Sequence, residues 1–395
     1  MAAITAAETN RHQRVILLEK SHQLLAKVKI SGGGRCNVTN AITDPARLGQ
    51  HYPRGGSALR GPLTRFGSKE TAAWFEARGV RLKAEPDGRI FPVTDQSQTI
   101  INCLIDSAQQ AGVEIRTGIK IESLQKQESG FTIALANGET VRAEKALIAT
   151  GSNRQGLEWA SRLGHTIEPS VPSLFTFNIR DERLAELAGI AVEPTELRLG
   201  KLRQVGPTLI THWGLSGPAV LKLSAWAARE LFEAHYRAEL TVNWLPEFSE
   251  DQLGEIFRST KAAHPRRLVG SQSPVPLPQR LWERLATRAG IETASRRWGA
   301  HQRWAAISRN EVAALIESLI RGKYAISGKG VFKEEFVTCG GVNLKEVNFK
   351  TLESRVCAGL YFAGEVLDID GLTGGFNFQS AWTTGWIAGR AMAGH

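Results

Sequence analysis

Hydrophobic and polar positions alternate along the first part of the chain as they do in packed strands and helices. A stretch of helix formers at 2–9 precedes an apolar run at 14–18, which ends at an acid. Two stretches with helical character, 71–78 and 96–111, follow, and the second leads into an apolar segment at 113–116. Helix, strand and acid in this order predict half of a βαβ unit with buried parallel strands.

The next segments favour antiparallel pairing. Residues 119–124, 131–135 and 139–142 predict a β-meander, and Asn137-Gly138 supplies a hairpin turn. The apolar run at 145–149 then predicts a buried strand.

The pattern changes near residues 169–172, and segments of alternating polar and apolar residues follow. The segments beyond predict a small, mostly antiparallel β domain with one helix over 218–232, and its strands are expected at 174–179, 190–199, 208–211 and 238–242. Residues 249–320 predict helices, interrupted by a stiff proline-rich loop at 273–278. A strand is expected at 360–363 and a helix at 378–393, so the alternation of strand and helix returns at the end of the chain. A nucleotide-binding domain split by a large insertion explains this order of elements.

Length and composition agree with several domains in one chain. The 395 residues exceed the roughly 250–300 residues at which a single core stops growing. The four cysteines stand far apart and form no CxxC pair, which predicts neither a zinc site nor a disulfide framework and fits a reducing cytoplasm. No apolar run approaches a membrane span, and the first ten residues do not resemble a signal peptide, so a soluble cytoplasmic protein is expected.

The net charge of +10 is concentrated in one segment. Residues 258–309 hold eleven Lys or Arg, opposed only by Glu283 and Glu292. Trp282, Trp298 and Trp304 lie among them. We favour a helical domain with a solvated basic face and core tryptophans, whereas base stacking with phosphate neutralisation, and thus nucleic-acid binding through 258–309, is the alternative.

Candidate chemistry begins at Glu19, the acid that ends the first apolar run. In dinucleotide-binding βαβ units such an acid hydrogen-bonds a ribose, about 20 residues after a Gly-rich turn. No GxGxxG occurs before Glu19, so the sequence is expected to begin inside the first helix of the unit, without the preceding strand and turn. An exposed acid at a strand end is the alternative interpretation.

A run of three glycines, Gly32 to Gly34, is followed by Arg35, Cys36 and Asn37. Glycines allow a backbone to approach a ligand closely, and an arginine offers a planar fork for phosphate or carboxylate. A flexible turn is the alternative. Cys36 has no nearby resolving cysteine, which argues against a redox role.

Two strand ends carry further candidates. Thr150 and Gly151 close the apolar run at 145–149. Gly364 and Glu365 follow the strand at 360–363, where open α/β sheets bind ligands. Gly374-Gly375 then opens the last helix, whose N–H groups and dipole can face a negative ligand. His212, before a predicted helix, is a possible proton donor, although a structural histidine is the more common case.

These motifs together resemble the BaiN-like family of NAD(P)/FAD-dependent oxidoreductases, also described as aminoacetone-oxidase-family or YhiN-like flavoproteins of bacteria. The resemblance rests on LLEK, SGGGRCN, IATG, THWGLSGPA and LYFAGEVLDIDGLTGGFNFQSAW and covers nearly the whole chain. It implies a two-dinucleotide-binding, Rossmann-like FAD domain over 1–170 and 332–395. It also implies a β-barrel-like insertion over 171–246 with about 322–331, and a helical domain over 247–321.

The resemblance also assigns the FAD site. It implies that the cofactor is bound by Glu19, Lys20, Gly32, Gly33, Gly34, Arg35, Cys36, Asn37, Ile121, Thr150, Gly151, Gly364, Glu365, Gly374, Gly375, Phe376 and Asn377. Glu19 would hold the adenosine ribose, Ile121 would lie near adenine, and Thr150 with Gly151 would lie near the pyrophosphate.

The expected function is hydride transfer between NAD(P)H or a small organic substrate and FAD, with the catalytic residues unassigned. A non-catalytic flavoprotein fragment and a basic nucleic-acid-binding flavoprotein are the alternatives.

Overall fold

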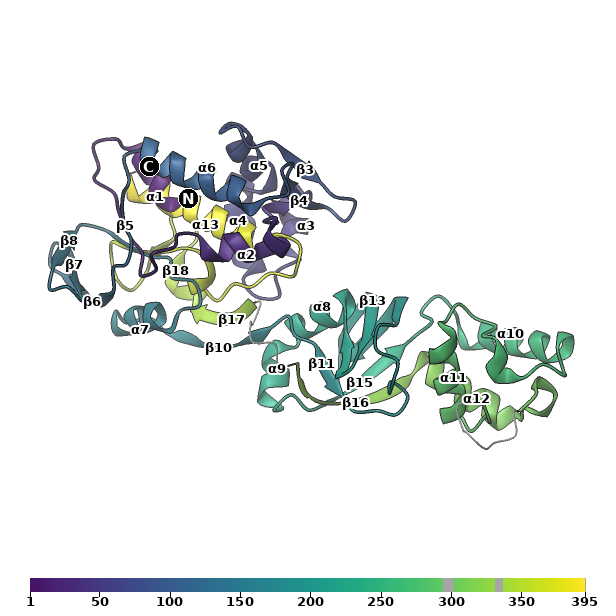
Figure 1. The fold of residues 1–395 in the computed structure, drawn as a ribbon. Coiled ribbons are helices and arrows are strands. Elements are labelled where there is room, and N and C mark those ends of the chain that lie inside the picture. Colours follow the sequence, from purple (N-terminus) through teal and green to yellow (C-terminus); the bar gives the residue numbers. More distant parts are fainter. Residues whose placement is uncertain (294–301, 331–336, 395) are drawn as a thin grey trace. The chain divides into compact units, whose positions relative to one another are not determined.

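The computed structural model describes residues 1–293, 302–330 and 337–394. The chain forms two compact units, and Figure 1 shows the elements of each. The first unit comprises Met1–Ser170 with Thr338–His395, and the second comprises Val171–Val337. The chain passes from the first unit to the second and back along β10 (Ile167–Ser173) and β17 (Val337–Val342), which pair as a two-stranded sheet.

Parallel strands form the centre of the first unit, as the apolar runs predict. Strand β1 (Ile16–Leu18) pairs in parallel with β5 (Glu114–Arg116). Strand β9 (Ala146–Ile148) pairs in parallel with β20 (Leu360–Phe362). The same sheet contains β19 (Glu353–Ser354), antiparallel to β20, and β18 (Val347–Asn348), antiparallel to β19. This arrangement confirms the α/β, Rossmann-like fold class.

Within the described residues, β1, β5 and β9 each have one edge without a paired strand. Strand β1 pairs only with β5, and β9 is the terminal strand of its sheet. A doubly wound sheet has the order 3-2-1-4-5, in which the first strand is central. With β1, β5, β9 and β20 as the second to fifth strands, that central position lies between β1 and β9. Residues Ile16, Leu17 and Leu18 are accordingly only half-buried.

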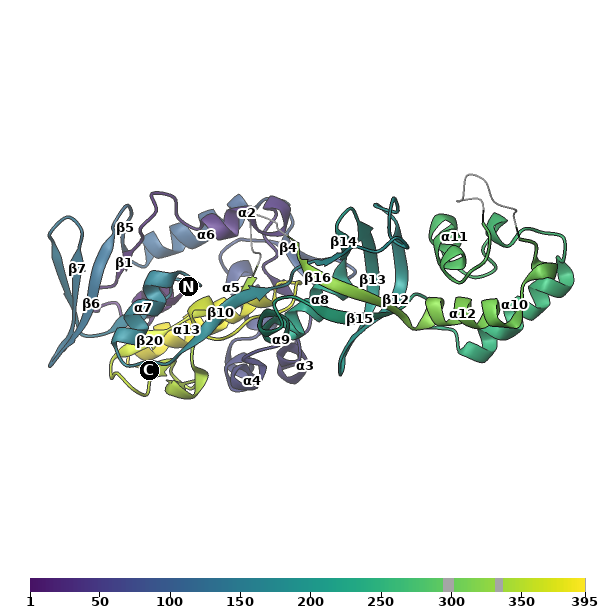
Figure 2. The same ribbon diagram turned by 90° about the horizontal axis from the view of Figure 1, so that it is seen from below.

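Helices cover this sheet and supply most of the core. The last helix, α13 (Phe376–Met392), packs along α1 (Ala2–Thr9), and the core between the helices includes Ile4, Phe75, Ile100, Leu104 and Trp382. Figure 2 shows α13 from below. The other helices of the unit are α2 (Ala26–Gly34), α3 (Pro45–Gly49), α4 (Gly56–Arg65), α5 (Ser68–Glu76), α6 (Ser97–Gln110) and α7 (Arg154–Arg162). The predictions of α1, α5 and α6 are confirmed.

The predicted β-meander is also confirmed as β6 (Ile121–Gln127), β7 (Gly130–Leu135) and β8 (Thr140–Ala143). A second small sheet was not predicted. Its strands are β2 (Thr39–Asn40), β3 (Leu82–Ala84) and β4 (Arg89–Pro92), and they are too short to give a periodic pattern.

The second unit contains a closed six-stranded barrel with the order β11-β14-β13-β12-β15-β16. This confirms the β-barrel-like insertion. The strands are β11 (Phe177–Ile179), β12 (Ala191–Leu199), β13 (Leu202–Thr211), β14 (Gly214–Ser216), β15 (Ala238–Asn243) and β16 (Gly322–Lys329). The single helix expected over 218–232 is instead two helices, α8 (Pro218–Trp226) and α9 (Ala228–Glu233), which meet at Ala227.

Helices α10 (Glu250–Ala263), α11 (Gln279–Arg288) and α12 (Arg309–Ile320) lie between barrel strands β15 and β16 in the chain. Trp282 and Trp304 are fully buried, and their rings stack 6.5 Å apart beside Phe257. The interpretation of these two tryptophans as core residues is therefore confirmed, and Trp298 lies outside the described residues. Within the described ranges, we find no helix with the length and apolar character needed to cross a membrane.

Candidate functional site

The two glycine-rich segments meet at the beginning of α13. The Asn37 amide lies 2.8 Å from the backbone nitrogen of Gly375, and only the amide oxygen can accept there. With its oxygen so placed, the amide nitrogen donates to the carbonyl of Thr39 at 3.0 Å. Asn40 Nδ2 donates to the carbonyl of Gly374 at 3.0 Å. The side chains that follow Gly34 thus hold the backbone turn that precedes the last helix.

The two residues between these asparagines bind the helix itself. Trp382 Nε1 donates to the carbonyl of Val38 at 2.9 Å, and Thr39 Oγ1 donates to Gln379 Oε1. Gln379 is fully buried. Four consecutive residues are therefore bonded to α13 or to its first turn, so the segment after the glycines and the helix N-terminus form one rigid substructure.

Gly375 fits this junction because it has no side chain. Its φ is +90°, and a Cβ there would lie 2.5 Å from the carbonyl oxygen of Thr39. No side chain caps α13, so the first helical N–H groups remain available to a ligand. A negatively polarised oxygen is the group that such a terminus binds best.

The loop between β20 and α13 is clamped from the other side by the turn between α3 and α4. Arg54 forms a bidentate ion pair with Asp370, whose side chain is fully buried. Tyr52 Oη donates to the carbonyl of Phe376 at 2.7 Å, and His51 stacks on the Phe376 ring at 4.4 Å. The predicted site residue Phe376 is thus 3% exposed and supports the loop by packing.

Asn377 also supports the loop. Its side chain accepts from the Gly371 N–H at 2.8 Å and donates to the Gly371 carbonyl at 2.9 Å. Both bonds use the side chain, so the backbone N–H of Asn377 stays free of them.

A second group of candidates gathers at the carboxyl ends of β9 and β20. Lys27 Nζ lies 2.6 Å from Glu365 Oε2. A Cβ at Gly151 would lie 3.5 Å from Lys27 Nζ and 3.6 Å from Glu365 Oε2. Thr150, which is exposed, directly precedes Gly151 in the sequence, and Gly364 directly precedes Glu365. Lys27 was not predicted, because a single exposed lysine at the start of a helix has no distinctive sequence pattern.

The glycine run lies at the end of α2 but leaves the right-handed helical conformation, because Gly32 and Gly33 have non-helical φ and ψ. Gly32, Gly33 and Gly34 form the end of α2, with φ values of +56°, +67° and +84°. A Cβ at Gly32 would lie 3.0 Å from the Asn37 nitrogen, whereas Cβ atoms at Gly33 and Gly34 would meet nothing within 4 Å. The last two glycines therefore border open space.

The residues after the glycines are more enclosed. Arg35 pairs with Glu85 at 2.6 Å and Asp95 at 3.4 Å, and its guanidinium lies over the Phe91 ring at 4.0 Å. The hydrogen bond with Glu85 raises the pKa of Arg35. Cys36 is fully buried, and burial raises the pKa of its thiol to about 11. The thiol is thus protonated at neutral pH, which agrees with a structural cysteine.

The third group follows β1. The Glu19 carboxylate accepts from the Ser21 N–H at 2.7 Å, and the Glu19 carbonyl accepts from the Ile119 N–H at 2.9 Å. Lys20 is exposed. Glu19 therefore lies beside the segment that leads into Ile121.

Ile121 is in turn connected to the second group through α7. Its carbonyl accepts from Gln155 Nε2 at 2.7 Å. The next residue, Gly156, packs so closely on Thr150 that a Cβ there would lie 1.8 Å from Thr150 Oγ1. The seventeen candidates thus lie in three local groups of the first unit.

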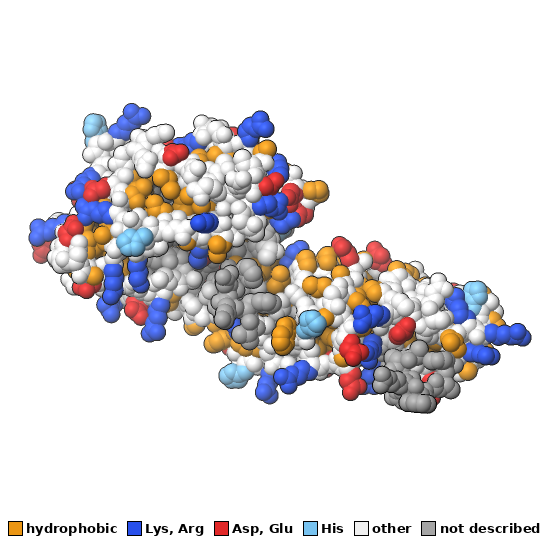
Figure 3. Space-filling view, in the orientation of Figure 1, with side chains coloured by type: hydrophobic (Ala, Val, Ile, Leu, Met, Phe, Trp, Pro, Cys, Tyr) orange, Lys and Arg blue, Asp and Glu red, His pale blue; other side chains and the backbone are white. Residues whose placement is uncertain are grey.

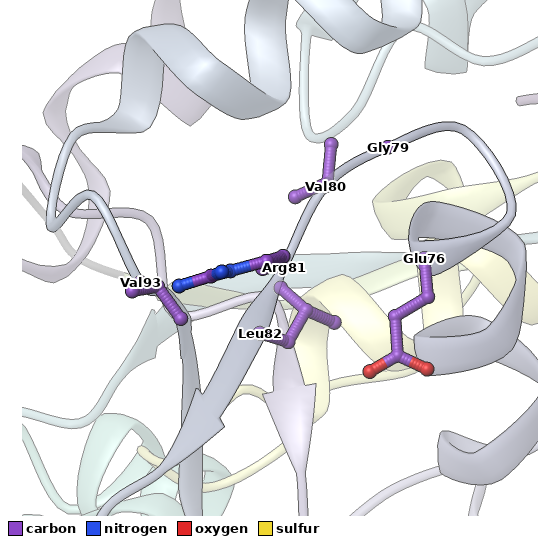
Figure 4. Close-up of a pocket in the computed structure, with 6 residues that line it drawn as sticks. All are labelled: Glu76, Gly79, Val80, Arg81, Leu82 and Val93. Atoms are coloured by element: carbon purple, nitrogen blue, oxygen red, sulfur yellow. The ribbon is translucent and has the colours of Figure 1, made fainter.

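His212 and a surface pocket beside α5 lie apart from these three groups in the sequence. His212 is exposed in the turn between β13 and β14, next to Trp213, which is 68% exposed. Figure 4 shows a shallow pocket between the end of α5 and β3, lined by Glu76, Gly79, Val80, Arg81, Leu82 and Val93. None of the seventeen candidate residues lines this pocket.

Comparison with known proteins finds a matching family model and similar proteins of known name. Residues 1–391 match the family model described as HI0933-like protein Rossmann domain. The chain is 31% identical over 408 residues to the 3-dehydro-bile acid delta(4,6)-reductase of Clostridium scindens, covering 100% of this chain and 96% of that protein. It is also 31% identical over 392 residues to the ribosomal RNA dihydrouridine synthase of Escherichia coli, covering 96% and 92%.

A solved structure has a similar fold. The 3-ketosteroid-delta4-(5alpha)-dehydrogenase of Rhodococcus jostii RHA1 aligns with a TM-score of 0.51 at 14% identity, covering 100% of this chain and 94% of that one. The sequence matches extend over both units, and they confirm the family resemblance that the motifs indicated. The chain belongs to the HI0933-like Rossmann family and is a FAD-dependent oxidoreductase.

Proposed function

We propose that this oxidoreductase is a reductase that uses NAD(P)H to saturate a C=C bond conjugated to a carbonyl. The substrate would gain a hydride at its β-carbon and a proton at its α-carbon, and NAD(P)H would become NAD(P)⁺. Two relatives of equal identity support this reaction class, because one is named a delta(4,6)-reductase and the other a dihydrouridine synthase. Both names describe the saturation of a C=C bond.

The junction between Asn37 and Gly375 carries the proposal. It keeps the N-terminus of α13 rigid and without a side-chain cap, as a site for a polarised carbonyl of the flavin requires. Gly33 and Gly34 border open space beside it, so their backbone can be approached closely. These features fit FAD, which when bound supplies the ring that accepts and passes on a hydride.

The other two groups would hold the rest of the cofactor. Gly151 and Thr150 at the end of β9 would approach the pyrophosphate, with Lys27 as the nearby cation. Glu19 would accept from a ribose hydroxyl, in place of its bond from Ser21, and Ile121 would lie near the adenine.

We favour uracil within RNA as the substrate over a small steroid-like enone. The observation behind this preference is the excess of Lys and Arg over 258–309, which a neutral steroid does not require. Uracil has a C5=C6 bond conjugated to its C4 carbonyl, so both substrates present the same reacting group.

The test is anaerobic reduction of the purified, flavin-loaded protein. We expect NADH or NADPH to bleach the flavin absorbance, and a uridine-containing RNA to restore it with formation of dihydrouridine. The small enone 4-androstene-3,17-dione serves as the second acceptor. Absence of bleaching by both nicotinamides would contradict the donor, and failure of both acceptors to restore the colour would contradict the reaction class.

A further inference from the structure

Two segments of the second unit lie side by side, and each carries exposed Lys or Arg side chains. Trp304 donates its backbone N–H to the Arg267 carbonyl at 3.0 Å, and Ala305 donates to the Pro265 carbonyl at 2.9 Å. Leu268 and Arg303 form an antiparallel bridge. Lys261 Nζ reaches the Ile307 carbonyl at 2.8 Å. The end of α10 and the residues after it are therefore fixed against 302–309.

This pair of segments has a rigid base. Trp304, Trp282 and Phe257 are buried to at least 98% and pack together directly beneath it. Trp304 alternates with the exposed Arg303, so the chain turns its indole inward and its neighbouring guanidinium outward. The tryptophans therefore cannot stack on bases, but they fix the backbone from which the arginines project.

We define the arginine face as Arg258, His264, Arg266, Arg303 and Arg309, all of which are exposed. Arg258 pairs with Glu255 at 2.5 Å. Among the residues that the structure describes, the other three arginines form no ion pair. In Figure 3, Lys and Arg side chains project from the end of this unit that carries α10.

Acidic groups near the arginine face are few and partly engaged. Glu311 accepts from the Ser308 N–H at 2.7 Å and from Gln302, which completes the cap of α12. Glu292 is exposed, and its backbone carbonyl accepts from the Gln302 N–H. The face therefore keeps a net positive charge.

The arginines of α11 differ from this set. Arg284 pairs with Glu186 at 2.7 Å, and Arg280 donates to the Glu186 carbonyl. Arg288 lies near enough to Asp181 to help lower the pKa of that carboxyl, although burial of Asp181 opposes this effect. These three side chains are explained by contacts inside the unit, whereas the arginine face is not.

We propose that the arginine face binds the phosphate backbone of RNA. Unpaired guanidiniums on a rigid support suit phosphate oxygens, to which arginine can bind through two parallel hydrogen bonds. Because no exposed Phe, Tyr or Trp belongs to the face, we expect the contact to be made to the backbone and to be independent of base sequence. The inference rests on the proposed function, since it supplies the docking surface for an RNA substrate.

The experiment compares two charge-matched double variants of the full-length protein. Arg266→Ala with Arg303→Ala removes two charges from the face. Arg142→Ala with Arg162→Ala removes two exposed arginines from the first unit and serves as the control. Binding of a fluorescently labelled, uridine-containing RNA stem-loop is measured by anisotropy over a range of KCl concentrations. Melting temperature and FAD content verify that both variants are folded.

For the face variant we expect affinity to fall roughly tenfold near physiological salt, and the slope of log K against log salt to fall by about 1–2. The control should keep the wild-type slope. Equal slopes in both variants would overturn the proposal. So would an arginine-face variant that loses binding to vesicles containing anionic phospholipid but retains wild-type binding to RNA.

Reduction assays separate this inference from the proposed function. If RNA binding depends on the face but no dihydrouridine forms, the inference stands and the proposed substrate fails. If the face variant forms dihydrouridine at the wild-type rate under subsaturating RNA, the inference fails and the proposed function stands. Reduction of 4-androstene-3,17-dione should be equal in both variants, because a neutral enone gains nothing from these charges.

Discussion

Asn37 and Gly375 are joined by a hydrogen bond of 2.8 Å, although they lie at opposite ends of the sequence. The bond connects the third residue after the glycine run of α2 to the residue before α13. Because Thr39, Asn40 and Val38 are bonded to the same helix region, a change at this junction affects both halves of the proposed flavin site.

Replacement of Gly375 by alanine should therefore abolish flavin retention. A Cβ would lie 2.5 Å from the Thr39 carbonyl oxygen, and φ of +90° is unfavourable for alanine. We expect a cost of about 1–2 kcal/mol from the backbone and about 1–3 kcal/mol from the steric overlap. The ratio of flavin to protein absorbance after purification measures the effect.

Gly254→Ala is the matched control for this change. Gly254 lies inside α10, and a Cβ there would meet nothing within 4 Å. Alanine should stabilise this helix by up to about 1 kcal/mol and leave flavin content unchanged. A Gly375→Ala protein with a full flavin spectrum would show that the junction does not border the cofactor.

Much of the fold could be predicted because the apolar runs are long enough to show a period. The four parallel strands, the meander and most helices follow from such runs, as the strand at 145–149 and the helix at 96–111 illustrate. The sheet of β2, β3 and β4 could not be predicted, since two to four residues give no pattern. Its partner strands are also separated along the chain, which sequence periodicity does not reveal.

The candidate site also has a part that the sequence predicts and a part that only the fold reveals. A run of glycines is visible in the sequence itself. At Gly375, the tight surroundings and the positive φ explain why a glycine is required. The partners of a side chain are a tertiary property, so the sequence could not show that Glu85 and Asp95 engage Arg35. Nor could it show that Lys27 pairs with Glu365, because the two are brought together only by the fold.

Removal of the buried carboxylate at Asp370 should destabilise the first unit and release flavin. Asp370→Asn leaves the Arg54 guanidinium, which is 12% exposed, without its charged partner. Breaking a buried pair in this way costs about 3–5 kcal/mol. Thermal unfolding and flavin content should both fall. In Arg54→Met with Asp370→Leu, neither charge is stranded, so recovery of the melting temperature is expected, and an equal loss in both proteins would contradict the argument.

His165 should make stability depend on pH below neutrality. Its side chain is fully buried between Glu346 at 3.1 Å and Ser354 at 2.8 Å. Burial lowers the pKa of His165 below its ordinary value of 6.5, and Glu346 only partly opposes this. As the pH falls, His165 in the folded state therefore binds its proton at a lower pH than in the unfolded state. Stability is complete above pH 6.5 and declines as pH falls from there towards the folded pKa.

The decline should reach at most about 1.4 kcal/mol per pH unit, which corresponds to one proton. Urea midpoints measured at several pH values below 7 provide the test. In His165→Gln this contribution disappears. A variant with the same pH dependence as the wild type would show that His165 is not the responsible group.

The final prediction concerns the unpaired edges of β1 and β9. Fusion of a segment with a β-strand and a GxGxxG turn before Met1 should place a strand between these edges. Backbone N–H and C=O groups that are buried without partners cost about 1–3 kcal/mol each, although here the half-buried residues of β1 are partly hydrated. The added turn would also bring N–H groups to the pyrophosphate.

Higher flavin content and a melting temperature raised by several degrees are therefore expected, at roughly 2–4 °C per kcal/mol for a protein of this size. A Gly/Ser-rich segment of the same length is the control, because it adds chain without strand propensity or a phosphate turn. If the two fusions and the unextended chain bind flavin equally and melt together, the edges of β1 and β9 do not accept a strand. A fusion that raises the melting temperature but not the flavin content would show that the added strand pairs with the sheet and that the added turn does not contribute to flavin binding.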